Sequence, residues 1–156
     1  MSGTMIEVAS YSKPDFPQAL KLIEEVTKDW GENWKELITE MFTTGERCPF
    51  KIERFVAKEN GEVLGLLVLK KEICAAIIYF LAAKTGRRGE GIGSELLRKA
   101  EEFARNSECS FLRVDVYDEF AKNKRFYLKN GFEESGRVKN YYELGDSQAF
   151  FFKKIR

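Results

Sequence analysis

The chain has 156 residues, 44% of them hydrophobic and 33% charged, and this balance predicts one globular domain over residues 1–156 rather than a disordered chain. Its 26 basic and 25 acidic side chains leave a net charge of +1, which gives no general attraction to nucleic acids or acidic membranes. The chain has no histidine, so mechanisms that use a histidine base are excluded. It has no apolar run near the roughly 18–20 residues that span a membrane. The first residues, MSGTMIEV, lack a secretory signal, so we expect a cytoplasmic protein.

The first half of the chain predicts a strand, two helices and a β-hairpin. Apolar residues recur at helical spacing after Pro14 and Pro17, and again after Gly31. Asn60 and Gly61 separate two apolar runs and are a strong signal for a hairpin turn. The expected segments are a strand over residues 6–10, a helix with Ala19, Leu22, Ile23 and Val26 on its apolar side, a helix over about 33–42, a loop over 45–50, and strands over 54–58 and 63–69.

The second half predicts a strand, a helix and a strand, followed by one more helix and two more strands. The nearly continuous apolar run over 73–83, after a turn at 70–72, is typical of a strand covered on both faces. The other expected segments are a helix over 92–106, a strand over 111–117, a helix over 119–129 that ends at Asn130 and Gly131, and strands over 132–142 and 148–153. The unit over 73–117 should be a parallel crossover, whereas the hairpins are antiparallel.

The order β-αα-βββ-α-β-α-ββ therefore predicts an α/β fold of the α+β kind. We expect a mixed, mostly antiparallel, twisted sheet of about seven strands with helices on both faces. The three cysteines, Cys48, Cys74 and Cys109, are far apart and have no zinc-ligand spacing, so we expect ordinary reduced residues and no metal site.

A loop rich in glycine and arginine precedes the helix expected at 92–106. Backbone N–H groups in the first turn of a helix lack intrahelical partners and favour anions. Gly91 and Gly93 would let a ligand approach the backbone, while Arg87 and Arg88 add positive charge. These features predict a site for a phosphate-bearing ligand. A glycine-rich turn without a ligand is the structural alternative.

Two common nucleotide motifs do not fit this loop. A Walker A loop ends in Gly-Lys-Ser/Thr, whereas Gly93 is followed by Ser94 and Glu95. A dinucleotide fingerprint needs a third glycine, and its position falls on Ser94 or Leu96. A nucleoside triphosphate or dinucleotide fold is therefore disfavoured.

The motif that fits is Arg88-x-x-Gly91-x-Gly93, together with Tyr127-Leu-Lys-Asn-Gly131-Phe132 at the end of the next helix. Here the chain resembles the GCN5-related N-acetyltransferase (GNAT) superfamily, whose motifs read Arg/Gln-x-x-Gly-x-Gly/Ala and Tyr-x-x-x-Gly-Phe. The order of elements matches as well, so the resemblance covers nearly the whole chain. It implies one acyl-CoA N-acyltransferase-like domain with acetyl-CoA as co-substrate.

The resemblance also implies where acetyl-CoA would bind. Backbone groups of the loop would hold the pyrophosphate, and the last residues of the preceding strand would pair with the pantetheine arm. The implied contacts are Leu81, Ala82, Ala83, Arg87, Arg88, Gly89, Glu90, Gly91, Ile92, Gly93, Ser94, Asn123 and Tyr127. In addition, the Leu81 backbone N–H would stabilise the oxyanion of the thioester carbonyl. Tight core packing would equally explain the two alanines.

For catalysis, the resemblance implies that Tyr127 is the general acid that protonates the departing CoA thiolate. A buried aromatic residue with a satisfied hydroxyl is the structural alternative. Phe120 departs from the Asn that the family often has seven residues before this Tyr, and Asn123 is included as a shifted amide contact. No carboxylate lies on the strand over 73–83, so the general base stays open among Glu24, Glu25, Asp115, Asp118, Glu119 and a relayed water.

These expectations together describe an N-acetyltransferase that moves the acetyl group of acetyl-CoA directly onto a primary amine. The alternatives are a non-catalytic acyl-CoA-binding module on the same fold, or an acyltransferase for another acyl chain. The acceptor, a small molecule or a protein, stays open, and a homodimer is one of the expected assemblies. The acceptor site should be built by the first two helices, their connection over 29–33 and the last hairpin. Its aromatic candidates are Trp30, Trp34, Phe42, Tyr141 and Tyr142, for which core packing is the structural alternative.

Overall fold

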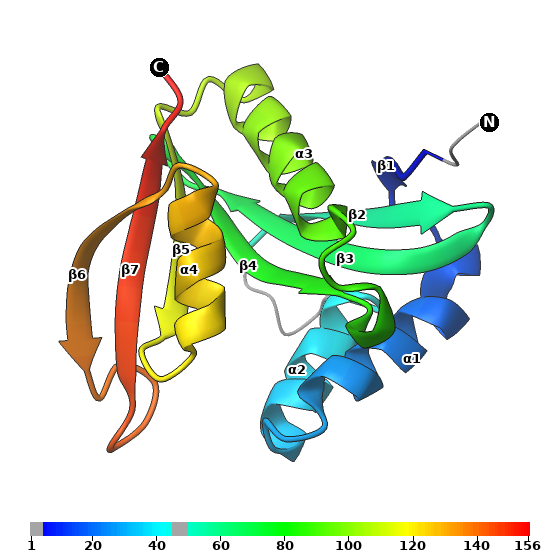
Figure 1. The fold of residues 1–156 in the computed structure, drawn as a ribbon, viewed down its shortest axis with the longest axis horizontal. Helices are drawn as coiled ribbons and strands as arrows, with labels where there is room; N and C mark the ends of the chain where they lie inside the picture. Colours follow the sequence, from blue (N-terminus) through cyan, green and yellow to red (C-terminus); the bar gives the residue numbers. More distant parts are fainter. Residues whose placement is uncertain (1–4, 45–49) are drawn as a thin grey trace. The chain divides into compact units, whose positions relative to one another are not determined.

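The computed structural model describes residues 5–44 and 50–156. Its helices and strands follow the predicted order, so the mixed α/β fold class is confirmed (Figure 1). The elements are β1 Glu7–Ser10, η1 Lys13–Asp15, α1 Phe16–Thr27, α2 Glu32–Met41, β2 Ile52–Glu59, β3 Glu62–Lys71, β4 Ala75–Ala83, η2 Thr85–Arg87, α3 Ile92–Asn106, β5 Phe111–Tyr117, α4 Ala121–Lys129, β6 Glu133–Lys139 and β7 Ser147–Lys154. The loop expected over 45–50 lies, except for its last residue, outside the described residues, and so does Cys48.

Seven strands form one sheet with the hydrogen-bonded order β1-β2-β3-β4-β5-β7-β6. The chain divides into two compact units, and both β4 and α3 contribute residues to each of them. The first unit comprises residues 1–70 and 79–100, and the second comprises residues 71–78 and 101–156.

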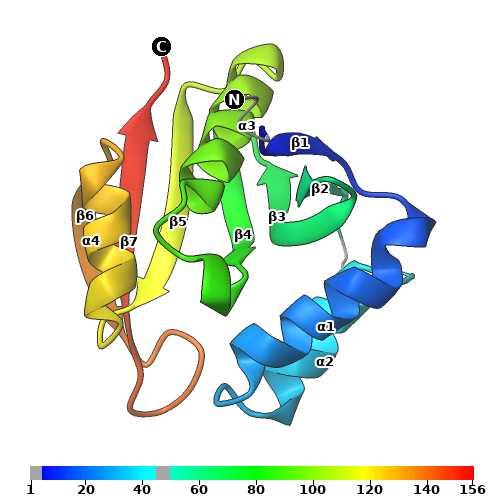
Figure 2. The same ribbon diagram turned by 45° about the vertical axis from the view of Figure 1, so that its right-hand side comes forward.

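The first unit has helices on both faces of its strands, as predicted. Leu66 and Val68 of β3 belong to a buried cluster with Leu22 and Ile23 of α1 and with residues of α2. On the opposite face, Ile92 and Leu96 of α3 lie against Gly65. Figures 1 and 2 show the same arrangement, with α1 and α2 on one side of β2 and β3 and α3 on the other.

The β2–β3 hairpin turns at Asn60 and Gly61, as its sequence predicts. Both residues have positive φ angles, 50° and 79°, which a two-residue turn of this kind requires. The side chain of Gln18 on α1 holds the turn from outside: its amide nitrogen donates to the Gly61 carbonyl at 3.1 Å, and its oxygen accepts from the Val63 N–H at 2.9 Å. The hairpin is therefore fixed to α1 as well as to its own strands.

The second unit combines one parallel and two antiparallel strand pairings. Residues Ala75–Ile78 of β4 pair in parallel with Phe111–Val114 of β5, which confirms the predicted parallel relation. Strand β7 lies between β5 and β6 and is antiparallel to both. The ring of Tyr127 on α4 lies 6.3 Å from that of Phe151 on β7, so α4 packs against the β7 face that carries Phe151.

The start of β4 differs from the prediction. Lys70 and Lys71 still belong to β3, and the turn follows them, with the Glu72 N–H donating to the Ala75 carbonyl. Ile73 is consequently 95% exposed, and Cys74 is an exposed turn residue rather than part of an apolar strand. Tyr79 is also 41% exposed, so the expectation of cover on both faces is wrong at these positions. Apolar composition alone did not distinguish an exposed turn from a buried strand.

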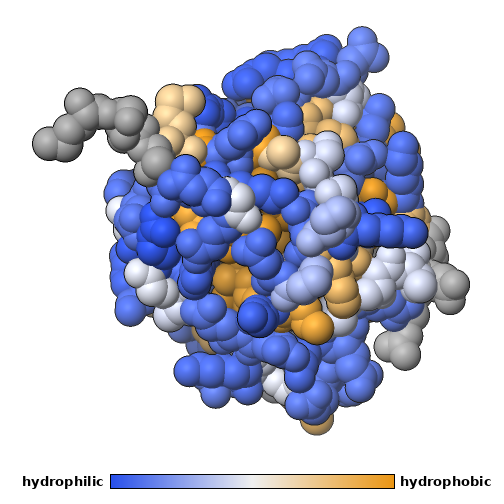
Figure 3. All heavy atoms as spheres, turned by 90° about the vertical axis from the view of Figure 1, so that its right-hand side faces the viewer, coloured by the Kyte–Doolittle hydropathy of each residue, from blue (hydrophilic) through white to orange (hydrophobic). Residues whose placement is uncertain are grey.

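Among the described residues, no helix is both long and apolar enough to cross a membrane. The space-filling view in Figure 3 shows hydrophilic residues over most of one face, with smaller hydrophobic areas between them. This agrees with a sequence in which one third of the residues are charged and the two signs are interspersed.

Candidate functional site

The glycine loop has the open backbone that its sequence predicts. Gly89 and Gly91 have φ angles of 85° and 87°, which residues with a Cβ rarely adopt. A Cβ built on either residue would meet no atom within 4 Å, so the space beside the loop is open. The first hydrogen bond of α3 runs from the Glu95 N–H to the Gly91 carbonyl at 3.0 Å. The amides of Ile92 and Gly93 precede this hydrogen bond and belong to the first turn of α3, where backbone N–H groups lack an intrahelical acceptor.

Close packing against β3 seats the start of α3. A Cβ at Gly65 would lie 2.8 Å from Ile92 Cγ2 and 2.9 Å from Leu96 Cδ1, too close for any real side chain. Ile92 itself is 1% exposed. The sequence named Gly91 and Gly93 but gave no signal for Gly65, because its partner lies 27 residues further along the chain.

Most of the positive charge in the loop is already paired. Arg87 donates from Nη2 to Glu59 Oε2 and from Nε to Glu90 Oε2, both at 2.7 Å. Lys84 forms an ion pair with Glu62. Arg88, which is exposed, makes no ion pair or hydrogen bond among the described residues. Of the loop cations named from the sequence, Arg88 is therefore the one whose guanidinium is available to a ligand.

Glu25, one of the candidate bases, is engaged by this loop. Its carboxylate accepts a hydrogen bond from the Thr85 N–H at 2.9 Å. That hydrogen bond, with the nearby charges of Lys84 and Arg88, outweighs the effect of burial and lowers the pKa of the Glu25 carboxyl. A carboxylate with a lowered pKa that already accepts a hydrogen bond from a backbone N–H is a poor general base.

The end of β4 presents the backbone that the sequence analysis assigned to the pantetheine arm. Phe80 and Ala82 are buried in the cluster with α1 and α2, whereas Leu81 and Ala83 are half-buried. The pairing of β4 with β5 ends at Ile78 and Val114, before these residues. Trp30, 37% exposed, packs edge-on against Phe80 at 6.2 Å.

Tyr127 lies in an aromatic cluster of the second unit. Its ring is 6% exposed and lies 5.3 Å from Phe132, and Phe126 and Phe151 also contact it. Burial, with a smaller contribution from the negative charge of Asp115, raises the pKa of the phenol well above its usual value. The phenol is therefore fully protonated at neutral pH.

The spacing of the motif that contains Tyr127 has a structural explanation of its own. The Phe132 N–H donates to the Tyr127 carbonyl at 3.0 Å, and the Gly131 N–H donates to Leu128 at 3.2 Å. With Gly131 at a φ of 88° and the Tyr127–Phe132 ring contact, this is a Schellman motif at the end of α4. The predicted glycine cap is confirmed. The helix end therefore explains Gly131 and Phe132 without any role in chemistry.

The remaining candidates for the general base differ in the groups with which their carboxylates interact. The Asp118 carboxylate forms ion pairs with Lys124, at 2.7 Å, and with Arg137. Asp115 accepts a hydrogen bond from the Tyr142 hydroxyl at 2.7 Å and has no ion pair among the described residues. Glu24 and Glu119 are exposed. Among the described residues, Asp115 is thus the half-buried candidate base that has no cationic partner.

Other expected contacts vary in their exposure. Asn123 is exposed on α4. Phe42, a predicted acceptor-site aromatic, is 1% exposed and packs against Tyr11, so it belongs to the core. Tyr141 and Tyr142 are each 49% exposed and pack on each other at 4.7 Å.

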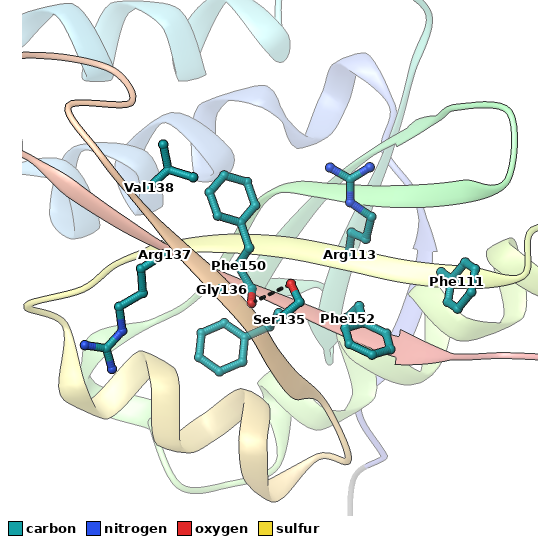
Figure 4. Close-up of a pocket in the computed structure, with 9 residues that line it drawn as sticks. Phe111, Arg113, Ser135, Gly136, Arg137, Val138, Phe150 and Phe152 are labelled. Atoms are coloured by element: carbon teal, nitrogen blue, oxygen red, sulfur yellow. Dashed lines mark hydrogen bonds between the residues drawn. The ribbon is translucent and has the colours of Figure 1, made fainter.

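A shallow groove of about 560 Å³ lies on the outer part of the second unit and was not expected from the sequence (Figure 4). Its lining consists of Phe111, Arg113, Ser135, Gly136, Arg137, Val138, Phe150, Phe151 and Phe152. Figure 4 shows the Ser135 hydroxyl donating to the Phe150 carbonyl, at 3.1 Å. The groove contains none of the predicted catalytic or cofactor residues, so it is not the candidate site.

Comparison with known proteins agrees with these features. The sequence model described as the acetyltransferase (GNAT) family matches residues 19–132, well over half of the chain. The chain therefore belongs to the GNAT acetyltransferase family. An uncharacterized N-acetyltransferase of Methanocaldococcus jannaschii is 30% identical over 101 residues, which make up 64% of this chain and 65% of that relative. The match thus spans just under two thirds of the relative's length.

Solved structures show the same fold. A GNAT-family protein from Desulfovibrio desulfuricans superposes with a TM-score of 0.84 at 16% identity, covering 97% of this chain and 100% of its own. An aminoglycoside 6′-N-acetyltransferase complexed with coenzyme A superposes with a TM-score of 0.77 at 14% identity, covering 96% and 97%. At such identities the likeness establishes the acyl-CoA N-acyltransferase fold and leaves the acceptor undetermined.

Proposed function

We propose that this protein transfers the acetyl group of acetyl-CoA to a primary amine by direct attack. The observation that carries the proposal is the open glycine loop, in which Gly89 and Gly91 keep the backbone bare beside the first turn of α3. Family membership and the CoA bound to a protein of the same fold make acetyl-CoA the best candidate for the anion. Because the family match includes residues of both compact units, we treat residues 1–156 as one catalytic domain.

In this proposal the cofactor is held mainly by backbone. First-turn amides of α3 and the Arg88 guanidinium bind the pyrophosphate, at positions from Arg88 to Ser94. The half-buried residues Leu81 and Ala83 pair with the pantetheine arm, and the small Ala82 leaves room for it. The Leu81 N–H donates to the thioester oxygen as negative charge develops there. Asn123, exposed on α4, is a further cofactor contact in the proposal.

The chemistry then needs two proton transfers. The neutral amine attacks the acetyl carbonyl carbon and forms the C–N bond. Asp115, directly or through a water, accepts the proton that the amine nitrogen loses. When the C–S bond breaks, the Tyr127 phenol gives its proton to the CoA sulfur. Afterwards Asp115 releases its proton to solvent and Tyr127 regains one from solvent, so the enzyme returns to its starting state.

The raised pKa of Tyr127 couples these transfers. A phenol whose pKa exceeds its usual value of about 10 is a weak donor toward a thiol whose pKa is about 8.5. Burial is the larger cause of that raised pKa, and the negative charge of Asp115 is the smaller one. Neutralisation of Asp115 would remove only the smaller contribution, so the general acid would become stronger while burial still raises its pKa.

The test is acetyl transfer to a panel of primary amines, followed through release of free CoA. Asp115→Asn and Tyr127→Phe should each lower kcat by about a hundredfold, because a positioned acid or base contributes that order of rate. CoA affinity should stay unchanged in both variants. If the wild-type protein binds CoA but acetylates no amine, the non-catalytic acyl-CoA-binding module is the better description. Faster turnover with longer acyl-CoA donors would instead favour another acyl chain.

A further inference from the structure

Four carboxylates surround the glycine loop, and we refer to Glu25, Glu59, Glu62 and Glu90 as the carboxylate clamp. Glu59 and Glu62 come from the β2–β3 hairpin, Glu25 from α1 and Glu90 from the loop itself. Each holds a group between Lys84 and Arg87. The loop is therefore fastened from three directions before any ligand arrives.

Arg87 has the central place in this clamp. Its Nη2 and Nε point to two different carboxylates, Glu59 and Glu90, each at 2.7 Å. The planar guanidinium suits such a double contact, which a lysine cannot reproduce. The Arg87 side chain is 28% exposed and that of Glu59 is 18% exposed, so the Glu59 contact is partly shielded from water. Arg87 thus joins the end of β2 to the turn that precedes Gly91.

The β2–β3 hairpin, which carries Glu59, is itself held in place by α1. Gln18 bonds both the Gly61 carbonyl and the Val63 N–H, so the turn between Glu59 and Glu62 is tied to α1. Glu25, on the same helix, accepts the Thr85 N–H. Helix α1, the hairpin and the loop therefore form one connected network within the first unit.

We infer that Arg87 is a positioning residue that holds the loop in its anion-binding shape through Glu59 and Glu90, and that it does not itself bind the pyrophosphate. Glu59 and Glu90 already compensate the positive charge of Arg87, so a phosphate that approached this guanidinium would also approach two carboxylates. Arg88 has no such partners and is the side-chain cation that meets the ligand. The identity of the anion rests on the proposed function, whereas the clamp is a property of the protein alone.

The direction in which Glu59→Gln changes CoA affinity distinguishes a positioning role of Arg87 from a phosphate-binding role. In a positioning role, Glu59→Gln and Arg87→Met should both weaken CoA binding, by about tenfold through misplacement of the loop amides. The double variant should bind no more weakly than the weaker single variant, because both changes break the same contact. If Arg87 were a phosphate ligand, Glu59→Gln would release it, and CoA would bind as tightly as before or more tightly.

Calorimetric titration with CoA measures these affinities. Arg98→Met is the matched control, since Arg98 pairs with Glu95 on the exposed side of α3, and it should leave CoA affinity unchanged. Arg88→Met should weaken CoA binding more than tenfold, while pantetheine, which lacks the pyrophosphate, should bind all variants equally. Unchanged CoA binding by Arg87→Met would overturn the inference.

A second measurement needs no ligand. Hydrogen–deuterium exchange of the loop amides, residues 84–91, should be faster in Glu59→Gln and Arg87→Met than in the wild type or Arg98→Met. If wild-type protein binds no CoA, the proposed function fails, yet faster exchange in these variants would still support the clamp. Equal exchange in all four proteins would overturn it.

Discussion

Tyr127 shows how one residue serves both the core and the proposed chemistry. Its ring fills an aromatic cluster at the end of α4, and the same burial raises the pKa of its hydroxyl. From the sequence, a buried aromatic role was only the alternative to a general acid. The pKa depends on residues of β5 and β7 that the sequence does not place nearby. A catalytic role for this residue therefore has a consequence for stability.

At alkaline pH, Tyr127 should make the protein less stable as the pH rises. The folded pKa lies above the unfolded value of about 10, so the stabilising effect is complete below pH 10 and is lost as pH increases above it. The free energy of unfolding should fall by up to about 1.4 kcal/mol per pH unit from this residue. Denaturant unfolding between pH 9 and 12 measures it, and Tyr127→Phe should reduce the slope. Tyr141→Phe, at a ring that is 49% exposed, is the control; equal slopes for both variants would contradict the prediction.

At the scale of single elements, the position of α3 depends on a residue outside it. The sequence predicted the bounds of this helix, residues 92–106, because its apolar residues recur at helical spacing. It did not predict how closely the helix approaches the sheet, since that distance is set by the missing side chain of Gly65 on β3. Helical periodicity indicates which side of a helix is buried. Only the folded structure shows which residues that side packs against.

Gly65→Ala should therefore destabilise the protein and disturb the start of α3. The new methyl group would meet Ile92 and Leu96 at less than 3 Å, and such overpacking costs about 1–3 kcal/mol. Thermal unfolding should show a lower Tm, by about 2–4 °C per kcal/mol. Gly86→Ala is the matched control, because a Cβ there meets no atom within 4 Å; its change should stay within about 0.5 kcal/mol. Similar Tm values for the two variants would refute this account of α3.

The short helix η1 depends on Asp15, whose carboxylate is almost fully buried. Burial alone would raise the pKa of Asp15, but the hydrogen bond and charge of Lys58 and two hydrogen bonds from Ser12 outweigh it, and the net pKa is lowered. A lowered pKa gives stability that is complete above about pH 4 and disappears as the pH falls further.

Asp15→Asn should accordingly cost about 2 kcal/mol at pH 7, because it removes a charged acceptor from three donors. The difference from the wild type should shrink progressively below pH 4, as measured by denaturant unfolding. Glu53→Gln serves as the control, since the Lys51–Glu53 pair is largely exposed and should contribute little at any pH. A deficit in Asp15→Asn that did not change with pH would contradict the assignment to charge.

For the whole molecule, ligand binding should be visible as stability. A ligand that binds only the folded state at a hundred times its Kd stabilises it by about 2.7 kcal/mol, so Tm should rise by about 5–10 °C. Differential scanning fluorimetry with CoA and acetyl-CoA measures this, and pantetheine should raise Tm much less. No increase with either CoA compound at millimolar concentration would contradict the cofactor assignment.

The fold of the whole chain was largely predictable from the sequence. The side-chain contacts within the candidate site were not. Hydrophobic periodicity, Asn60-Gly61 and Asn130-Gly131 gave the order of elements and both turns, because these signals are local. The start of β4 was placed wrongly, since Ile73 and Cys74 are apolar yet exposed. Arg87 was expected to meet phosphate, and its contact with Glu59 arises only when residues 28 positions apart come together.

The carboxylate clamp also bears on how a ligand would find the site. The four carboxylates of the clamp outnumber the three cations Lys84, Arg87 and Arg88, although only Lys84 and Arg87 are paired with them, so the loop offers an approaching anion little long-range attraction. If the loop binds an anion, the association rate should depend only weakly on ionic strength. Selection among anions would then depend on the geometry of the backbone amides at contact distance rather than on long-range attraction.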